Sequence, residues 1–560
     1  MTSANARPGA TVAVGPLAVH TTSIWARLPL HPFAIALAPV LSMFASYPGS
    51  LERADVGSAM VAATAVAIAL VVVAAAAYRD VQKAALFVCA LLAVFVTVGA
   101  LYDSIEVWQL AGYRIARRRY VVPLVYLGLA AFGLTLFRSR RRFAALTALA
   151  NIVTIGALLP PLVRLAKVEL MDQLAGNARV ILPAVAAEVP PTAKPDIYYV
   201  VFDRYGDERT LREQGVDNTP QFEYLANKGF FLARDSRSNY INTFLSLSSS
   251  LNFTYLDEVP ARVGAAAEDW RPIHELILSH RTGAFLRGHG YEYFHLGSWH
   301  PSTRWNPQAT RNINYYTAVP RAAMQLLDNP LFEPVQLAFD SPLIDHRRQH
   351  WERIVRQVDD GVRLAATAGP KFVFLHLLVP HQPYVFNRDG RFVPRHEENR
   401  RTRRENYANQ VHAANLLMRR LIDGVLERSP SPPVIIVQGD EGPYPEGTEG
   451  RLYEWSRATP DILRTRSGIL NAYHLPGEHS TRLYASISPV NSFRVVFNTY
   501  LGTRLPLLPD RTIRHGSHRR PFTFTDITHV VNARAPGAVT TTESRREPDG
   551  RYSRRRDRGV

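Results

Sequence analysis

The chain has 560 residues, enough for two or more domains, and 47% of them are hydrophobic. Its formal net charge at pH 7 is +17, but only five of the 65 basic residues are Lys, and no basic stripe is interleaved with aromatic residues. We therefore expect no nucleic-acid partner, and attraction to anionic lipid headgroups accounts for the charge. The single cysteine, Cys89, excludes an internal disulfide.

Hydrophobic residues are unevenly spread and are densest within the first 163 positions. Five apolar stretches there approach the roughly 20 residues that a helix needs to cross a bilayer. They cover residues 30–47, 56–77, 84–101, 120–137 and 143–163. The second stretch, VGSAMVAATAVAIALVVVAAAA, has no polar face, unlike a helix on the surface of a globular protein. Because the first stretch begins late and four more follow it, we expect a multi-pass membrane domain rather than a cleavable signal peptide.

Five crossings place the two ends of the chain on opposite sides of the bilayer. We expect a cytoplasmic tail at 1–27, a membrane domain with five transmembrane helices at 28–163, and an extracytoplasmic remainder. Loop charge does not decide this orientation, because eight basic residues lie in the predicted inner segments and seven in the outer ones. A juxtamembrane helix and linker at 164–195 lead to a catalytic domain at 196–535. A charged tail at 536–560 is expected to be disordered.

From residue 196 onward, apolar runs that are typical of strands alternate with helical segments. The strand runs are DIYYVVFD, GYEYFHL, KFVFLHLLV and PVIIVQGD. This alternation predicts an α/β sandwich domain, with a mostly parallel sheet and helices on both faces. The carboxyl ends of parallel strands meet at one edge of such a sheet, so residues distant in the sequence come together there.

Acidic residues close two of the predicted strands. Asp203 ends DIYYVVFD, Asp440 ends PVIIVQGD, and Glu441 follows directly. Acids crowded at the end of a buried strand repel one another unless a cation neutralises them, which favours a metal site. A strand-end aspartate such as Asp203 is also typical of a solvated turn or a helix N-cap, and its local sequence leaves that alternative open.

Thr243, in SNYINTFLSLSSSLN, is the candidate nucleophile. Asn239 or Asn242 can cap a helix that starts near it, which places the Thr hydroxyl where unpaired backbone amides favour an anionic oxygen. A coordinated cation would also help to ionise that hydroxyl. In the alternative, Thr243 only caps the helix and the serines that follow are small packing residues, and local sequence does not separate the two.

Three histidines belong to the strands and loops of the same sheet edge. His381, in HLLVPHQPYVF, follows a strand, so we expect it in a loop where it binds an anionic group or protonates a leaving oxygen. His300, which ends GYEYFHLGSWH, has the same standing. His376 lies inside its strand and is expected to be a core residue.

These residues, in this order, resemble the sulfatase-like branch of the alkaline phosphatase superfamily over about residues 196–526. A multi-span anchor followed by such a domain is similar to lipoteichoic acid synthases and lipid A phosphoethanolamine transferases. In that family an acid after the first strand, a nucleophilic Thr at a helix start and a late Asp-His pair bind one catalytic metal. By resemblance, Asp203, Thr243 and Asp440 take those places.

The resemblance also covers both loop histidines. His381 matches the His of the family's His-x-Pro segment, which contacts the transferred phosphoryl group. His300 matches the His of a Gly-Lys-Trp-His stretch, with Ser298 where the Lys would be. Both are therefore expected to bind substrate.

The sequence departs from the family's pattern in two places. Glu441 stands where the relatives have a metal-binding His, which leaves an all-oxygen set of Asp203, Thr243, Asp440 and Glu441. Such a set suits Mn, Mg or Ca better than Zn. No Cys-x-Pro-x-Arg or Ser-x-Pro-x-Arg string is present, so the formylglycine of true sulfatases cannot form at the nucleophile position, and sulfate ester hydrolysis is the weaker option.

We therefore expect a membrane-anchored, metal-dependent transferase that moves a phosphoryl headgroup through a phospho-threonine at Thr243. One divalent ion would be held by Asp203, Asp440 and Glu441. The expected partners are membrane lipid, a phospholipid headgroup donor, and an envelope glycan or lipid acceptor. The alternatives are a sulfatase-like hydrolase or phosphodiesterase of the same superfamily, or a metal-poor pseudoenzyme that acts as a membrane scaffold.

Overall fold

The structure is a computed structural model. It describes residues 28–533 except 47–52, 106–108, 111–112, 115–117, 175–179, 181, 192, 316–330, 332–344, 449–452 and 478. The predicted N-terminal tail at 1–27 and the predicted disordered tail at 536–560 lie outside the described residues.

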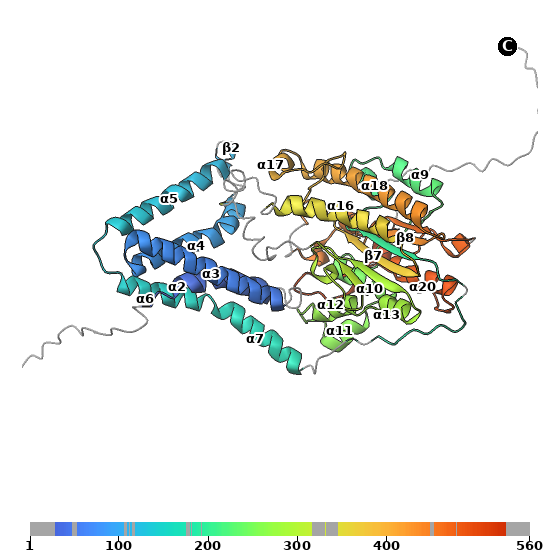
Figure 1. Ribbon diagram of the computed structural model, residues 1–560, viewed down its shortest axis with the longest axis horizontal. Helices are drawn as coiled ribbons and strands as arrows, with labels where there is room; N and C mark the ends of the chain where they lie inside the picture. Colours follow the sequence, from blue (N-terminus) through green and yellow to red (C-terminus); the bar gives the residue numbers. More distant parts are fainter. Residues whose placement is uncertain are drawn as a thin grey trace, which may run out of the picture.

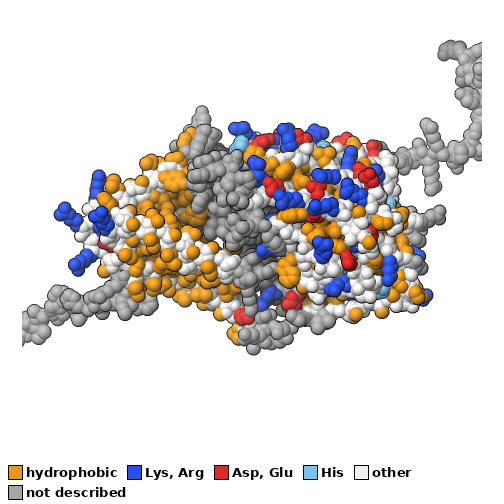
Figure 2. All heavy atoms as spheres, viewed as in Figure 1, with side chains coloured by type: hydrophobic (Ala, Val, Ile, Leu, Met, Phe, Trp, Pro, Cys, Tyr) orange, Lys and Arg blue, Asp and Glu red, His pale blue; other side chains and the backbone are white. Residues whose placement is uncertain are grey.

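The first part of the chain is a group of apolar helices, drawn in blue to teal in Figure 1. Large apolar side chains such as Val73 and Leu124 are exposed on them, and Figure 2 shows hydrophobic side chains covering this part. A continuous apolar surface of this size marks contact with lipid. The helices are α2 (His31–Ser46), α3 (Arg53–Tyr78), α4 (Val81–Ile105), α5 (Arg118–Arg138), α6 (Ala144–Gly156) and α7 (Leu159–Leu174).

Four segments of this part are long and apolar enough to cross a membrane, so the chain is a membrane protein. They are Val56–Tyr78, Val81–Gly99, Tyr120–Arg138 and Ala144–Lys167. The first predicted span falls on α2, whose 16 residues reach only about 24 Å at 1.5 Å per residue, short of the roughly 30 Å hydrocarbon core. The predicted count of five spans therefore stays a prediction.

The second part contains a seven-stranded sheet in the order β4-β9-β8-β3-β7-β5-β6. The five strands from β8 to β6 are parallel, and β9 and β4 add an antiparallel edge. This confirms the predicted, mostly parallel α/β domain. The strands are β3 (Ile197–Phe202), β4 (Phe231–Leu232), β5 (Glu292–Leu296), β6 (Arg311–Ile313), β7 (Lys371–Leu377), β8 (Val434–Gln438) and β9 (Asn471–His474).

The central strand β3 shows why the sheet is covered on both faces. All six residues of IYYVVF are buried, and their side chains alternate between two apolar clusters. Tyr198, Val200 and Phe202 join the cluster that contains residues of α16 (His346–Leu364) and α18 (Arg403–Arg428). The other three residues join the cluster that contains residues of α10 (Thr243–Asn252), α13 (Arg281–Gly288) and α20 (Pro489–Tyr500).

Shorter elements complete the described part of the chain. They are α8 (Glu208–Glu213), α9 (Thr219–Asn227), α11 (Glu258–Val263), α12 (Arg271–Leu278), α17 (Arg395–Glu398), α19 (Pro460–Ser467), α21 (Thr528–Asn532), the 3-10 turns η1 (Pro301–Thr303), η2 (Trp455–Arg457) and η3 (His479–Arg482), and the small strands β1 (Gln109–Leu110), β2 (Tyr113–Arg114), β10 (Ile513–Arg514) and β11 (Thr525–Asp526).

The helical part and the α/β domain also touch away from their chain connection. Arg164 on α7 pairs with Glu268 at 2.8 Å between Nη2 and Oε2. Tyr126 on α5 donates its hydroxyl hydrogen to the carbonyl of Leu331 at 2.5 Å. The domain therefore contacts the helical part directly (Figure 1).

Candidate metal centre

The ends of β3 and β8 bring the two predicted aspartates together. The backbone N–H of Asp203 donates to the carbonyl of Leu377 at 2.9 Å, which carries the β3–β7 ladder one residue past the end of β3. Asp440 follows β8, the neighbour of β3 on its other side. Both side chains are buried, at 0% and 2% exposure.

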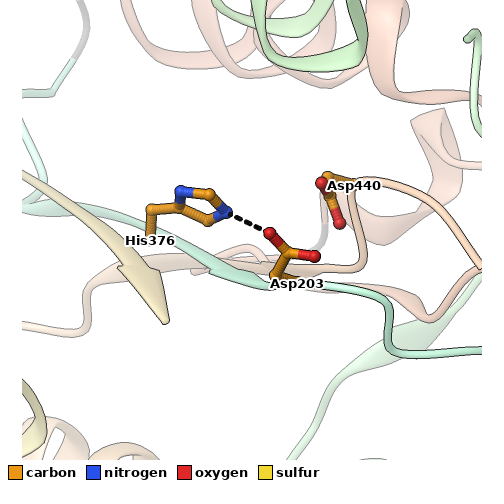
Figure 3. Close-up of side chains that lie close together, drawn as sticks. All are labelled: Asp203, His376 and Asp440. Atoms are coloured by element: carbon orange, nitrogen blue, oxygen red, sulfur yellow. Dashed lines mark ion pairs between the residues drawn. The ribbon is translucent and has the colours of Figure 1, made fainter. Parts of the chain in front are cut away.

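A histidine completes the cluster. Asp203, His376 and Asp440 each offer one ligand atom, and these atoms lie within 4.8 Å of one another (Figure 3). His376 Nε2 is 3.2 Å from Asp203 Oδ2. His376 is buried, as the sequence suggested, but its ring points toward the two carboxylates rather than serving only as core.

Strand register is the signal that could have found His376. Val201 on β3 pairs with His376 on β7. Residues 201 and 203 share a face of their strand because side chains alternate, and paired residues of neighbouring strands also share a face. His376 and Asp203 therefore had to lie on one face at the same sheet edge.

Four buried atoms of the cluster have no hydrogen-bond partner among the described residues. They are both carboxylate oxygens of Asp203, Nε2 of His376 and Oδ2 of Asp440. The contact between His376 Nε2 and Asp203 is not aligned for a hydrogen bond. Each such atom costs about 1–3 kcal/mol. The pKa of Asp440 is raised, first by burial and then by the charges of Asp203 and Glu441. A divalent cation would satisfy these atoms and offset the repulsion, so the residues fit a metal ion.

The second ring nitrogen of His376 is held by a neighbouring turn. Nδ1 of His376 lies 2.8 Å from the hydroxyl of Thr303, which lies 2.9 Å from the hydroxyl of Ser298. If Nδ1 carries the proton and donates it to Thr303, the Nε2 lone pair faces the two carboxylates. A second residue that fixes the tautomer of a histidine ligand in this way is typical of metal sites.

A chain of buried hydrogen bonds holds Thr303 in turn. Gly283 N–H donates to His280 Nδ1 at 2.9 Å, so the proton of His280 is on Nε2, 3.1 Å from the hydroxyl of Tyr293. That hydroxyl lies 3.0 Å from His295 Nδ1, and His295 Nε2 lies 3.0 Å from the carbonyl of Thr303. Burial lowers the pKa of His280 to about 3 and of His295 to about 4, so both rings are neutral at pH 7.

Thr243 is the first residue of α10, as predicted. The side chain of Asn242 caps the helix by accepting from the backbone N–H of Phe244 at 3.0 Å and of Leu245 at 3.4 Å. Of the two predicted caps, Asn242 is thus the one in the structure, while the amide of Asn239 donates to Ser488 and Arg511 instead.

The first turn of α10 is tied to Asp440. Ser246 donates its hydroxyl hydrogen to the carbonyl of Asp440 at 2.7 Å. The hydroxyl of Thr243 lies close enough to the Asp440 carboxyl to lower its pKa by hydrogen bonding, although burial and neighbouring acids raise that pKa more. The structure therefore brings Thr243 to the cluster, and its role as nucleophile stays a prediction.

Glu441 is not part of the cluster. One of its oxygens pairs with the guanidinium of Arg466, and the other is 3.4 Å from Nε of Arg204. Arg466 is fully buried and also donates to the carbonyls of Gly442 and Ile241. Two arginines are therefore the charged partners of Glu441, and its predicted metal role stays a prediction. The predicted oxygen-only ligand set differs from the structure, where an imidazole stands with two carboxylates.

Both predicted loop histidines lie beside the cluster. The ring of His300 meets that of His376 edge-on, with centroids 5.6 Å apart, and packs 4.4 Å from the ring of Phe244. Burial and the charge of Arg204 lower the pKa of His381 to about 4, against an opposing effect of Asp203. His381 is therefore a neutral imidazole at pH 7.

The chain belongs to the sulfatase family, whose profile matches residues 195–487, more than half of its length. This confirms the resemblance read from the motifs. Among curated proteins, none matches the chain.

Several solved structures are similar in fold. The C-terminal periplasmic domain of EcEptC from Escherichia coli is 13% identical, with a TM-score of 0.39, over 62% of this chain and 96% of that one. The integral membrane lipooligosaccharide phosphoethanolamine transferase A (EptA) from Neisseria meningitidis is 12% identical, with a TM-score of 0.36, over 85% and 94%. The C-terminal periplasmic domain of phosphoethanolamine transferase EptC from Campylobacter jejuni is 13% identical, with a TM-score of 0.34, over 57% and 92%. At such values none of these likenesses assigns an activity to this chain.

Proposed function

We propose that this membrane protein transfers a phosphoryl headgroup from a phospholipid to a hydroxyl of an envelope glycan or lipid, through a phosphorylated Thr243. One observation carries the proposal. A buried trio of Asp203, His376 and Asp440, with unsatisfied ligand atoms, lies beside a Thr hydroxyl at a helix N-terminus. That combination provides a nucleophile and a place for the charge that activates it.

Asp203, His376 and Asp440 would hold one divalent ion, with Thr243 beside them. Imidazole suits zinc and other first-row transition metals, whereas carboxylates also suit Mn and Mg. Because the site offers an imidazole as well as carboxylates, there is no longer a reason to expect Mg, Mn or Ca rather than Zn. This set of ligands favours Mn or Zn over Ca. When bound, the ion supplies positive charge that favours an ionised Thr243 hydroxyl and screens the charge on phosphoryl oxygens.

In the first half of the reaction, Thr243 Oγ1 attacks the phosphorus of a phosphodiester. A new phosphorus–oxygen bond forms while the bond to the leaving alcohol breaks. The proton of the Thr243 hydroxyl passes to the neutral imidazole of His381, which gives it to the leaving oxygen. His300 binds the phosphoryl oxygens through a ring N–H.

In the second half, a hydroxyl of the acceptor attacks the phosphorus of phospho-threonine. The bond between phosphorus and Thr243 Oγ1 breaks, and the proton of the acceptor hydroxyl travels through His381 to the released Thr oxygen. The enzyme returns to its starting state, and one headgroup has moved from the donor alcohol to the acceptor.

Basic residues cluster at two turns of the helical part. Arg79 and Lys83 lie at the turn between α3 and α4, and Lys83 donates to the carbonyl of Ser139 at the turn between α5 and α6 at 2.6 Å. Arg138 and three further arginines at 140–142 lie at this second turn. Figure 2 shows basic side chains gathered at the end of the helical part that lies away from the α/β domain. Because the predicted outer segments carry seven basic residues against eight in the inner ones, this cluster does not fix the orientation, and an extracytoplasmic catalytic domain follows from five crossings with a cytoplasmic N-terminus. The helices then keep the site near its lipid donor.

The test uses full-length protein and phosphatidylethanolamine or phosphatidylglycerol with a labelled headgroup. Thr243→Ala should reduce label release by at least about 10³-fold, as for removal of other nucleophiles, while metal content is unchanged. Thr243→Ser, which keeps a hydroxyl, should retain activity and phospho-enzyme. Label release by Thr243→Ala at the unmodified rate would exclude this nucleophile. Label found only in water identifies a hydrolase, and neither label release nor metal identifies a scaffold.

A further inference from the structure

Arg204 follows Asp203 in the chain, and its backbone is fixed on both sides. Its N–H donates to Asp440 Oδ1 at 3.0 Å, and its carbonyl accepts from the hydroxyl of Tyr407 at 2.8 Å. Its φ of 66° places a residue that has a side chain in the left-handed region, which is unfavourable. Such conformations persist where surrounding contacts impose them, and they cluster at functional sites. The backbone therefore holds Arg204 in an uncommon form next to two ligands of the candidate metal centre.

The guanidinium of Arg204 makes its contacts within the protein through Nε and Cζ. Nε lies 3.8 Å from Asp203 Oδ1 and 3.4 Å from Glu441 Oε1. Cζ lies 4.2 Å from the centre of the Tyr444 ring. The two terminal nitrogens, Nη1 and Nη2, have no hydrogen-bond partner in the described part of the chain. They are therefore available to donate to a ligand.

The side chain of Arg204 is also accessible to a ligand. It is 14% exposed, and the residue lines a cavity of about 470 Å³. This volume lies within the range of about 300–1,000 Å³ that is usual for small-molecule sites. Burial and the charge of Arg204 lower the pKa of His381, so the guanidinium is also near the candidate proton carrier. Arg204 therefore belongs both to the wall of this cavity and to the surroundings of the metal centre.

The charge of Arg204 is not cancelled by its acidic neighbours once a metal ion is bound. One divalent ion would match the two charges of Asp203 and Asp440, and Arg466 is in direct contact with Glu441 and matches its charge. The cavity lining otherwise carries two acids and two arginines, which balance in number. They are Glu213, Glu446, Arg403 and Arg404. The one positive charge left over is that of Arg204, and a phosphodiester carries one negative charge.

A guanidinium suits phosphoryl oxygens because its terminal nitrogens present parallel N–H donors at a fixed spacing. During phosphoryl transfer, negative charge spreads over the oxygens that do not change partners, and donors that are already in place stabilise it. We propose that Arg204 is a further catalytic residue, whose terminal nitrogens bind non-bridging oxygens of the transferred phosphoryl group. This inference rests on the proposed function, since it names the residue that would hold the group while it moves to and from Thr243.

The first test is calorimetric binding of inorganic phosphate to full-length protein in detergent. The protein is loaded with Mn and carries Thr243→Ala, so that no covalent bond forms. Adding Arg204→Met should weaken phosphate binding at least tenfold, because it removes two charge-assisted donors. Metal content should stay the same, and a lower metal content would assign Arg204 to the metal centre instead. No phosphate binding by the Thr243→Ala protein, or equal binding after Arg204→Met, would overturn the proposal.

Two further variants make the assignment specific. Arg204→Lys keeps the charge but loses the paired donors, so its phosphate affinity should lie between, and it serves as the test if Arg204→Met does not fold. Arg404→Met is the matched control, since Arg404 lines the same cavity but donates to the carbonyl of Gln214 at 2.8 Å. Its phosphate affinity should change less than about twofold. An equal loss in Arg404→Met and Arg204→Met would assign the effect to the cavity as a whole and refute the contact.

Headgroup release separates this inference from the proposed function. With Thr243 intact, Arg204→Met should lower kcat for release of a labelled headgroup about 100-fold or more, as for removal of other transition-state donors. Normal headgroup transfer and normal phospho-threonine in Arg204→Met would refute only the role of Arg204. Weakened phosphate binding in Arg204→Met, together with headgroup release that Thr243→Ala does not reduce, would refute only the proposed reaction.

Discussion

An aspartate stands at each end of strand β3, and the two carboxylates have different surroundings. At the start, Asp196 accepts from Lys371 Nζ at 2.5 Å and from its backbone N–H at 3.2 Å, and the same Nζ donates to the carbonyl of Thr367. At the end, Asp203 faces His376 and Asp440, and neither of its oxygens has a hydrogen-bond partner in the described part of the chain. Both aspartates are buried.

This difference distinguishes an acid whose counter-charge comes from the protein itself from one whose counter-charge a bound ligand would supply. At the start of β3 the protein provides its own counter-charge, and Lys371 is only 1% exposed, so the pair is closed to outside ions. At the end of β3, Nε of Arg204 lies 3.8 Å from Asp203 Oδ1, but this guanidinium also faces Glu441, so it balances the two aspartates only in part. A buried charge that the protein does not fully balance itself marks a functional site.

The largest expected effect comes from removing the counter-charge of Asp196 at the start of β3. Lys371→Met should destabilise the α/β domain by about 3–5 kcal/mol, because it leaves the Asp196 charge buried and unpaired. Thermal and denaturant unfolding of detergent-solubilised protein measure this. Metal affinity should not change. The double variant with Asp196→Leu should regain most of the stability, and a double variant no more stable than Lys371→Met alone would contradict the compensated pair.

Asp440→Asn, near the end of β3, should weaken metal binding but should not destabilise the metal-free protein. Structural zinc sites with four ligands bind with about 10–16 kcal/mol, so the loss of one ligand costs roughly 3 kcal/mol, or more than about 100-fold in affinity. The metal-free protein should become more stable, because the repulsion between Asp440 and Asp203 disappears. Chelator competition and melting in EDTA measure the two effects. A metal-free variant that melts lower than the unmodified protein would show that these acids serve the fold.

Thr303→Val tests whether the contact between Thr303 and His376 Nδ1 orients this histidine for metal binding. The variant keeps the shape of the side chain but removes the acceptor for His376 Nδ1, so metal affinity should fall by about 10–100-fold. Thr303→Ser should restore it. Thr282→Val is the matched control, since Thr282 is equally buried and donates to the carbonyl of Leu251 at 2.7 Å, away from the cluster. An equal loss in both Val variants would assign the effect to general packing.

The smallest expected effect is a loss of stability at acidic pH. Burial and the charge of His518 lower the pKa of His274, beside Phe244, to about 3, below the value of about 6.5 in the unfolded chain. The unfolded state therefore binds the extra proton first, and stability falls as pH drops below about 6.5. Between pH 7 and 5 this histidine should account for about 2 kcal/mol of lost stability. His274→Asn should melt with less pH dependence, and an identical acid profile would contradict the assignment.

The sequence predicted the fold where strands are long and apolar. The runs that become β3, β5, β7 and β8 were recognised by their bulky residues and turn boundaries, and they form the parallel core of the sheet. The strands β4, β6 and β9 were not, because they have two to four residues and their pairing is set by tertiary contacts.

The site was predicted in part for the same kind of reason. Asp203 and Asp440 were found because acids that close buried strands are conspicuous in a sequence. His376 was missed because a buried histidine in a core strand and one that faces a metal site look alike until the register of β3 and β7 is known. The pairing of Glu441 with Arg466 was not predicted, because Arg466 comes from α19 and nothing local indicates it.

The most direct test of the account is the metal content of purified full-length protein and two variants, measured by mass spectrometry of the elements. The unmodified protein and Glu441→Gln should each hold one divalent ion per chain, and His376→Gln should hold none. An ion that remains in His376→Gln but is lost from Glu441→Gln would contradict the cluster of Asp203, His376 and Asp440.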